Sequence, residues 1–284
     1  MRAPAIFLPH GGGPMPLLND PGHKELTEFL KGKARTYFNP RPKAIVVVTA
    51  HWEETQPRVS SVTTNKLYYD YGGFPPETYN IDFPAKGDPQ VAARVVEALR
   101  NAGIQAFTDG SRGWDHGVFV PLKLLLEDYE TPIVAMSVCL SQDAAEHYKI
   151  GKALASLRDE GIAIVGSGMS FHNFAEFRRT WSAPADAKLP TINEPFDDAL
   201  TAACAIKDAD ERGKSFAAWD SMPGARNAHP IRQAEHFMPL VVVAGAGGDD
   251  TGKKILEWDM RGCKQSAWVW QLREQPQSGV TLEA

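Results

Sequence analysis

Cysteine is scarce in this chain of 284 residues, which contains three: Cys139, Cys204 and Cys263. The three are widely separated, form no C-x-x-C pair and are odd in number, which argues against a disulfide framework. We therefore expect a protein with reduced thiols, located in the cytoplasm.

Long apolar runs and an excess of positive charge are also missing. The chain has no stretch of about 18 uninterrupted apolar residues, so a membrane-spanning helix is not expected, and residues 1–13 lack the anatomy of a signal peptide. The net charge of −5 provides no basic surface, which excludes nucleic acid as an expected partner. Internal repeats and low-complexity tracts are absent as well.

Four continuous runs rich in valine and isoleucine are present instead, at 4–8, 44–50, 133–138 and 162–166. Continuous apolar runs are typical of strands covered on both faces. A fifth segment, 266–272, alternates in polarity and is predicted as a strand at a sheet edge.

Amphipathic segments lie between these runs. Residues 88–103 are predicted as a helix with Asp88 as its N-cap and Gly103 past its end. A second helix is expected after Ser141, the candidate cap, and a third over 193–208.

The alternation of strands and helices predicts an α/β fold. We expect a single domain over residues 1–284, with a mostly parallel or mixed central sheet flanked by helices. Two proline-rich stretches, at 71–89 and 181–190, are predicted as long loops, and loops of that length are uncommon unless they serve function.

Histidines follow three of the predicted strands: His10, His51 and His172. Ligands of open α/β sheets bind beyond the carboxyl ends of the strands, so these imidazoles are expected to meet at that edge of the sheet. Gly11, Gly12 and Gly13 remove side-chain bulk after His10, where another group can approach. Neutral imidazole suits iron, zinc, copper and nickel, and the pattern therefore indicates a metal site.

The other histidines occupy different surroundings. His116 stands in a turn-like sequence, and His236 precedes Pro239 near a predicted helix start, with Glu235 as an alternative acidic ligand. His229 lies on a loop, and its sequence leaves open whether it lines a pocket. His23 and His147 lie in polar, helix-like segments and are expected at the surface.

Six motifs in order resemble the class III extradiol ring-cleavage dioxygenases of the LigB type, and most closely their DOPA 4,5-dioxygenase branch. They are LPHGGGPM, VVVTAHWE, YDYGGFPPETY, GWDHGVFVPL, IVGSGMSFHN and AEHFMPLVVVAGAGG. The resemblance covers roughly residues 4–272 and implies one divalent metal at the carboxyl edge of the sheet.

The resemblance also implies roles for individual residues. His10, His51 and His236 match metal ligands, and His172 matches an acid/base residue beside the metal that is also a potential fourth ligand. His116 matches a residue that orients or protonates the substrate. Independently of the resemblance, Tyr71 and Phe74 are candidate walls for an aromatic ring.

The activity implied is cleavage of a catechol by O2 next to its diol, giving a semialdehyde. Fe(II) is the expected cofactor, with Zn(II) an alternative in the resting form, and the partners are the catechol and O2, with a homodimer as the default assembly. Gly12, Met169 and Phe171 depart from the family pattern and leave the substrate open. Arg226 or Arg232 could hold a substrate carboxylate, although surface exposure is an equal expectation.

Two other functions remain open at this point. One is a zinc-dependent hydrolase built on the same histidines, in which an activated water is the nucleophile. The other is a binding protein of the Memo type, which shares the fold but would be expected to lack the YDYGGFPP and WDHG elements.

Overall fold

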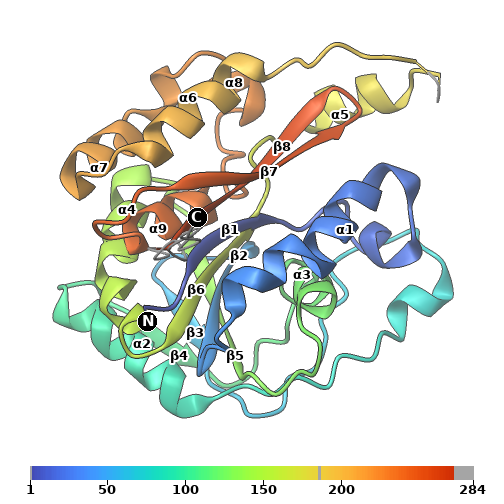
Figure 1. The fold of residues 1–284 in the computed structure, drawn as a ribbon. Helices are drawn as coiled ribbons and strands as arrows, with labels where there is room; N and C mark the ends of the chain where they lie inside the picture. Colours follow the sequence, from blue (N-terminus) through green and yellow to red (C-terminus); the bar gives the residue numbers. More distant parts are fainter. Residues whose placement is uncertain (1, 185–186, 272–284) are drawn as a thin grey trace, which may run out of the picture.

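A sheet of eight strands crosses the molecule, with helices against both of its faces (Figure 1). The computed structural model describes residues 2–184 and 187–271. The strand order is β4-β3-β5-β2-β6-β1-β8-β7. The strands are β1 Ala5–Pro9, β2 Ala44–Glu54, β3 Arg58–Ser60, β4 Phe107–Asp109, β5 Ile133–Cys139, β6 Ile162–Gly168, β7 Lys253–Met260 and β8 Cys263–Trp270.

The four central strands, β5, β2, β6 and β1, run parallel to one another. Val46 of β2 is paired with Val134 on one side and with Ile164 on the other, and all three are fully buried. The four strands predicted from the valine-rich runs are confirmed, and the α/β class with a mixed sheet is confirmed with them, because β8 and β7 continue the sheet in antiparallel pairing.

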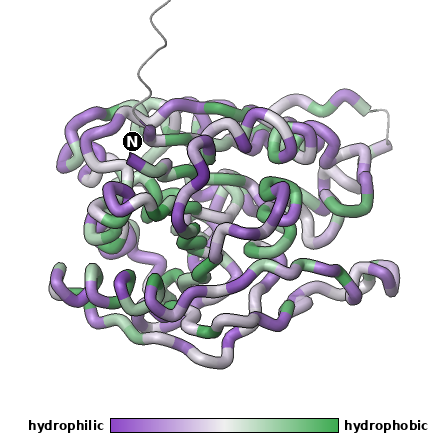
Figure 2. Tube along the Cα trace, turned by 60° about the horizontal axis from the view of Figure 1, so that its bottom comes forward, coloured by the Kyte–Doolittle hydropathy of each residue, from purple (hydrophilic) through white to green (hydrophobic). Residues whose placement is uncertain are grey.

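Helices cover the sheet through their apolar faces. The α-helices are α1 Lys24–Lys31, α2 Pro89–Asn101, α3 His116–Leu125, α4 Ala144–Leu154, α5 Phe174–Trp181, α6 Glu194–Ala205, α7 Ala209–Ala217, α8 Ala225–Ala228 and α9 Met238–Ala246. In Figure 2 hydrophilic and hydrophobic residues alternate along the outer helices, as expected where one helix face packs inward. The apolar helix α9 contacts β1, β2 and β6 and is completely buried.

The predicted helix signals are partly confirmed. Asp88 caps α2 by accepting hydrogen bonds from the N–H groups of Gln90 and Val91, and α6 covers most of the third predicted helix. The prediction for Ser141 is wrong, because the carboxylate of Asp143 caps α4 by accepting the N–H of Glu146 at 2.8 Å.

The prediction that the last strand lies at a sheet edge is also wrong. β8 pairs with β1 on one side and β7 on the other, and it is buried along its whole length. Its polar residues gave it an alternating pattern, yet they have internal partners: Gln265 donates to the carbonyl of Phe171, and Ser266 donates to Asp197. The edge strand on this side of the sheet is β7, for which the sequence analysis made no prediction.

The predicted loops connect these elements. Residues 71–88 form a loop with one short 3-10 turn, Pro76–Tyr79, and one isolated bridge at Lys86, as predicted from their prolines. Two residues of the second loop, 185–186, lie outside the described residues. No helix within the described ranges has both the length and the apolar character needed to cross a bilayer.

Candidate metal centre

The ends of β1 and β2 carry the first two histidines into one place. His10 directly follows β1, and its N–H donates to the carbonyl of Gly168 at the end of β6. His51 lies inside β2, which extends beyond the predicted end at residue 50. The pairing of β2 with β6 ends at Thr49, and its register with β5 shifts between Thr49 and Glu53. His51 therefore occupies an irregular part of the strand, where its ring can turn toward His10.

His236 reaches the same place from the turn that precedes α9. The N–H of Met169 donates to the carbonyl of His236 at 3.1 Å, which joins the end of β6 to this turn. Gly168 makes the approach possible, because a Cβ atom there would lie 2.2 Å from the His236 carbonyl oxygen. The prediction that His236 lies near the helix start is confirmed.

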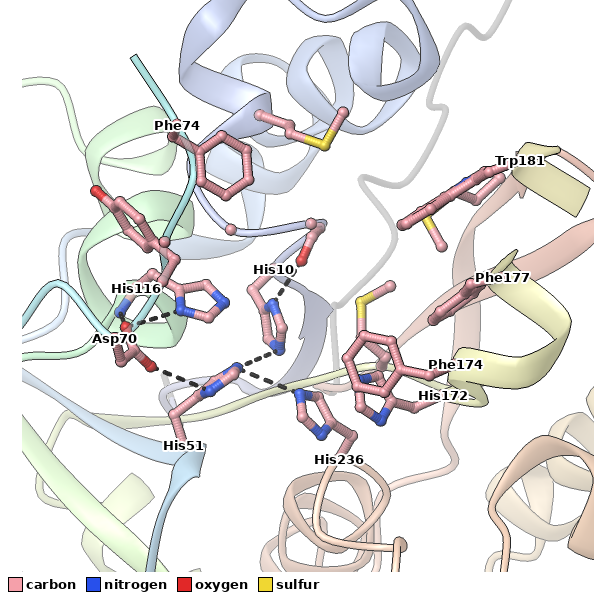
Figure 3. Close-up of a pocket in the computed structure, with 18 residues that line it drawn as sticks. His10, His51, Asp70, Phe74, His116, His172, Phe174, Phe177, Trp181 and His236 are labelled. Carbon is pink, nitrogen blue, oxygen red and sulfur yellow. Dashed lines mark hydrogen bonds and ion pairs between the residues drawn. The ribbon is translucent and has the colours of Figure 1, made fainter. Parts of the chain in front are cut away.

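The Nε2 atoms of these histidines converge (Figure 3). His51 Nε2 lies 3.3 Å from His10 Nε2 and 3.2 Å from His236 Nε2. The cluster His10, His51 and His116 and the cluster His172, Glu235 and His236 each place their ligand atoms within 4.8 Å of one another. The contact between His51 and His236 joins the two clusters into one centre.

An oxygen atom lies behind each of the three converging rings. His10 Nδ1 lies 2.8 Å from the carbonyl oxygen of Gly11, His51 Nδ1 lies 3.1 Å from Asp70 Oδ2, and His236 Nδ1 lies 2.9 Å from Glu235 Oε1. Each oxygen accepts a hydrogen bond from an Nδ1–H group, so each Nε2 presents its lone pair to the centre.

Burial keeps the imidazoles of His10 and His236 neutral. Loss of hydration, followed by the neighbouring histidines, places the pKa of His10 and of His236 well below the usual range. Neutral imidazole is the form that binds a metal.

This arrangement fits a metal ion. Two nitrogen ligands about 2.0–2.1 Å from one tetrahedral ion lie roughly 3.3–3.4 Å apart, close to the separations found here. Without a cation between them, lone pairs at such distances repel each other. A set of imidazole nitrogens suits iron, zinc, copper or nickel better than magnesium or calcium.

Asp70 holds two of the histidines and was not identified from the sequence. Besides its contact with His51, its Oδ1 accepts the backbone N–H of His116 at 3.0 Å and lies 2.9 Å from His116 Nδ1. Burial opposes ionisation of this carboxyl, but hydrogen bonds with His116 and His51 prevail and hold its pKa well below the usual range. The available signal was its place in the YDYGGFPP motif, between two aromatic residues.

His172 lies beside His236, in the loop between β6 and α5. The two rings are stacked with centroids 3.5 Å apart, and His172 Nδ1 lies 3.6 Å from Glu235 Oε1. Burial, together with the nearby His229, His51 and His116, lowers the pKa of His172 to about 3. His172 is therefore neutral at physiological pH.

The glycines after His10 shape the rim of the centre. Gly11 has φ +80°, and a Cβ atom there would lie 2.7 Å from Pro16 and 2.8 Å from His23. The N–H of Gly12 donates to His23 Nε2 at 3.0 Å, while Asp20 lies 2.7 Å from Nδ1 of the same ring. His23 thus fixes the course of the glycine loop.

The expectation that His23 and His147 are exposed is wrong, since both are buried. Each ring accepts a hydrogen bond from a backbone N–H that would otherwise lack an acceptor. His23 accepts from Gly12, and His147 accepts from Cys139. His229 is also buried and donates to the carbonyl of Ser170, and it does not line the cavity.

A cavity of about 420 Å³ opens above the histidines. The predicted wall residues Tyr71 and Phe74 line it, and so do His116 and His172. Of the residues that depart from the family pattern, Gly12 and Met169 line the cavity, whereas Phe171 is buried against Phe177.

Arg226 and Arg232 lie elsewhere, in a separate hollow with Glu53 and Gln142. Arg226 pairs with Asp220 and covers the ring of Trp219. The structure therefore gives neither arginine a contact with the cavity.

The family model for the catalytic LigB subunit of aromatic ring-opening dioxygenase matches residues 4–269. The chain belongs to this LigB family. The predicted resemblance is confirmed, and members of the family depend on a metal, in agreement with the histidine centre.

Relatives of this chain include named dioxygenases and a protein of known structure. It is 44% identical to "Dioxygenase tasH" of Hapsidospora irregularis over 87% of this chain and 79% of that protein. It is 35% identical to a 4,5-DOPA dioxygenase extradiol of Beta vulgaris over 89% of this chain and 91% of that protein. A crystal structure of the uncharacterised Escherichia coli K12 protein JW3007 superposes with a TM-score of 0.74 at 31% identity, over 95% of this chain and 100% of the other.

Family and relatives together identify this LigB protein as an extradiol ring-cleavage dioxygenase. The hydrolase and the Memo-type binding protein are set aside accordingly. The elements that a Memo-type protein would lack are present and form the site, since Tyr71, Phe74 and His116 line the cavity.

Proposed function

We propose that the protein is an Fe(II)-dependent dioxygenase that opens the ring of a catechol next to its diol and releases a semialdehyde. His10, His51 and His236 are the proposed ligands. The observation that carries this proposal is the convergence of their Nε2 atoms at 3.2–3.3 Å, at the floor of a cavity that two further histidines line.

A redox-active ion such as Fe(II) supplies a place where a catechol and dioxygen bind together, which relieves the spin barrier to their reaction. None of the three proposed ligands is a carboxylate. Negative charge lies one step further out, in Asp70 behind His51 and Glu235 behind His236. These carboxylates orient the rings and strengthen them as donors.

His172 is the proposed acid/base. Its neutral ring accepts a catechol proton at Nε2, the nitrogen remote from Glu235. Glu235 Oε1, 3.6 Å from Nδ1, then stabilises the imidazolium electrostatically. The same proton is available for return when the ring opens.

His116 orients the substrate. Its Nδ1 and its backbone N–H are both held by Asp70, so the ring direction is fixed. The remaining nitrogen, Nε2, is free to accept a hydrogen bond from a catechol hydroxyl.

The test is anaerobic loading with Fe(II), followed by addition of a panel of catechols to aerated buffer. We expect one O2 consumed per catechol, together with a yellow ring-opened product, and no turnover by protein loaded with Zn(II). Turnover that is indifferent to oxygen, or equal with both metals, would refute the proposal.

A further inference from the structure

One wall of the cavity is an aromatic face of α5. Phe174, Phe177 and Trp181 follow one another at intervals of three and four residues, which places them on the same side of the helix. The rings of Phe177 and Trp181 are stacked with centroids 5.4 Å apart. Phe174 and Trp181 are 54% and 45% exposed, so this wall reaches the cavity mouth (Figure 3).

The rest of the lining is largely apolar too. It includes Phe74 and the thioethers of Met15, Met169 and Met260. Methionine side chains adapt their shape to apolar ligands. The hydroxyl of Tyr71 is already used, since it donates to the carbonyl of Thr78 at 2.5 Å.

Lysine and arginine side chains are missing from the described lining of this cavity. Its lining carboxylate, Asp70, is held by two histidines. Arg178 is exposed on α5 but does not line the cavity. A substituent carrying a carboxylate would lose hydration here without gaining a partner.

We infer that the substrate is a catechol whose ring substituent is uncharged and apolar and extends along Phe174, Phe177 and Trp181. The inference rests on the proposed function for the catechol end of the substrate. The cavity volume of about 420 Å³ falls within the range of pockets that hold ligands larger than a single ring.

The test uses catechols that differ only in the substituent. 4-Methyl-, 4-ethyl- and 4-propylcatechol form an apolar series, while 3-(3,4-dihydroxyphenyl)propanoate, dopamine and DOPA add negative, positive and both charges. Anaerobic calorimetry on the metal-loaded protein gives Kd, and oxygen uptake gives kcat/KM for the same compounds.

We expect Kd to fall by about fourfold for each added methylene group. 4-Propylcatechol should bind at least about tenfold more tightly than the propanoate and than either amine, because no buried partner compensates their charge.

Substitutions in α5 test whether this helix is the source of the affinity gain along the apolar series. Trp181→Ala should remove most of the gain along the apolar series, and Trp181→Arg should shift preference toward the propanoate, since arginine pairs with carboxylates. Leu140→Ala is the matched control, because Leu140 is 54% exposed and lies outside the cavity. It should leave every Kd unchanged.

The outcomes separate the two proposals. If ring cleavage occurs but the propanoate or DOPA binds most tightly, the inference on the substituent is overturned and the proposed function stands. The same holds if a charged catechol binds tightly and that binding is lost in Arg178→Gln. The expected order of Kd without oxygen uptake would support the apolar ligand and refute the reaction.

Discussion

Asp70 and Glu235 stand on two sides of the histidine centre and hold their partners differently. Asp70 lies within 3.1 Å of both His51 and His116 and also accepts a backbone N–H. Glu235 lies 2.9 Å from His236 but 3.6 Å from His172. Each carboxylate thus links a proposed ligand to a second histidine, tightly in the first pair and loosely in the second.

The electrostatics follow the same division. Hydrogen bonds hold the pKa of Asp70 far below its usual range despite burial, whereas burial raises the pKa of Glu235. The Asp70 side therefore fixes the orientation of the His51 and His116 rings. The Glu235 side leaves His172 room to gain and lose a proton.

The largest effect is expected from removing a shared ligand, in His51→Ala. His51 contacts both other proposed ligands and Asp70, so bound metal and oxygen uptake should fall to background together. Metal content by mass spectrometry and oxygen uptake check this, with Leu140→Ala as the control. Full metal content in His51→Ala would contradict the ligand assignment.

Substitution of His172, the loosely held histidine, should affect the reaction and leave metal binding unchanged. His172→Gln is expected to keep its metal and lose about 10²–10⁴-fold in kcat, or about 3–5 kcal/mol of barrier lowering, because general acid–base assistance is removed. Steady-state kinetics beside metal analysis measure this. Loss of metal in this variant would instead make His172 a ligand.

The two carboxylates can be compared directly in Asp70→Asn and Glu235→Gln. Loss of a carboxylate behind a ligand histidine costs about 10–100-fold in metal affinity or activity. We expect Asp70→Asn near the upper end and Glu235→Gln near the lower end, measured by metal titration against a chromophoric chelator. If the two variants lose equal metal affinity, or Glu235→Gln loses more, the distinction between the Asp70 and Glu235 sides is refuted.

An effect of similar size concerns acid stability and uses His229, which has no carboxylate partner among the described residues. Burial lowers its pKa to about 3 in the fold, against about 6.5 in the unfolded chain. The unfolded chain therefore binds the extra proton, and the stability is present above pH 6.5 and lost as the pH falls toward 3.

From pH 7 to pH 5 this histidine should remove about 2 kcal/mol from the free energy of unfolding. Urea unfolding of the metal-free protein at several pH values measures how the free energy of unfolding changes with pH. The substitution His229→Gln should reduce this pH dependence. If the free energy of unfolding depends on pH equally in the variant, His229 contributes nothing to that dependence.

Much of this arrangement was visible in the sequence. His10 and His51 end apolar runs, and parallel strands bring such ends together, so two members of the centre followed from a local pattern. The sequence also indicated that glycine is needed after His10. The positive φ of Gly11 confirms this, as does the lack of space for a Cβ atom beside Pro16 and His23.

The remaining parts depend on contacts between distant segments. Asp70 lies 46 residues before His116 in a loop without periodicity, so no pattern paired them. His23 and His147 looked like surface residues because their neighbours are polar, while the N–H groups they satisfy belong to Gly12 and Cys139. His236 was assigned through the family resemblance, not through spacing.

The most direct test of the account is an anaerobic crystal structure of the Fe(II)-loaded protein with anomalous data at the iron edge. We predict one iron peak bonded to Nε2 of His10, His51 and His236, with His116 and His172 outside bonding distance. A peak bonded to His116 in place of His236, or no iron among these rings, would contradict it.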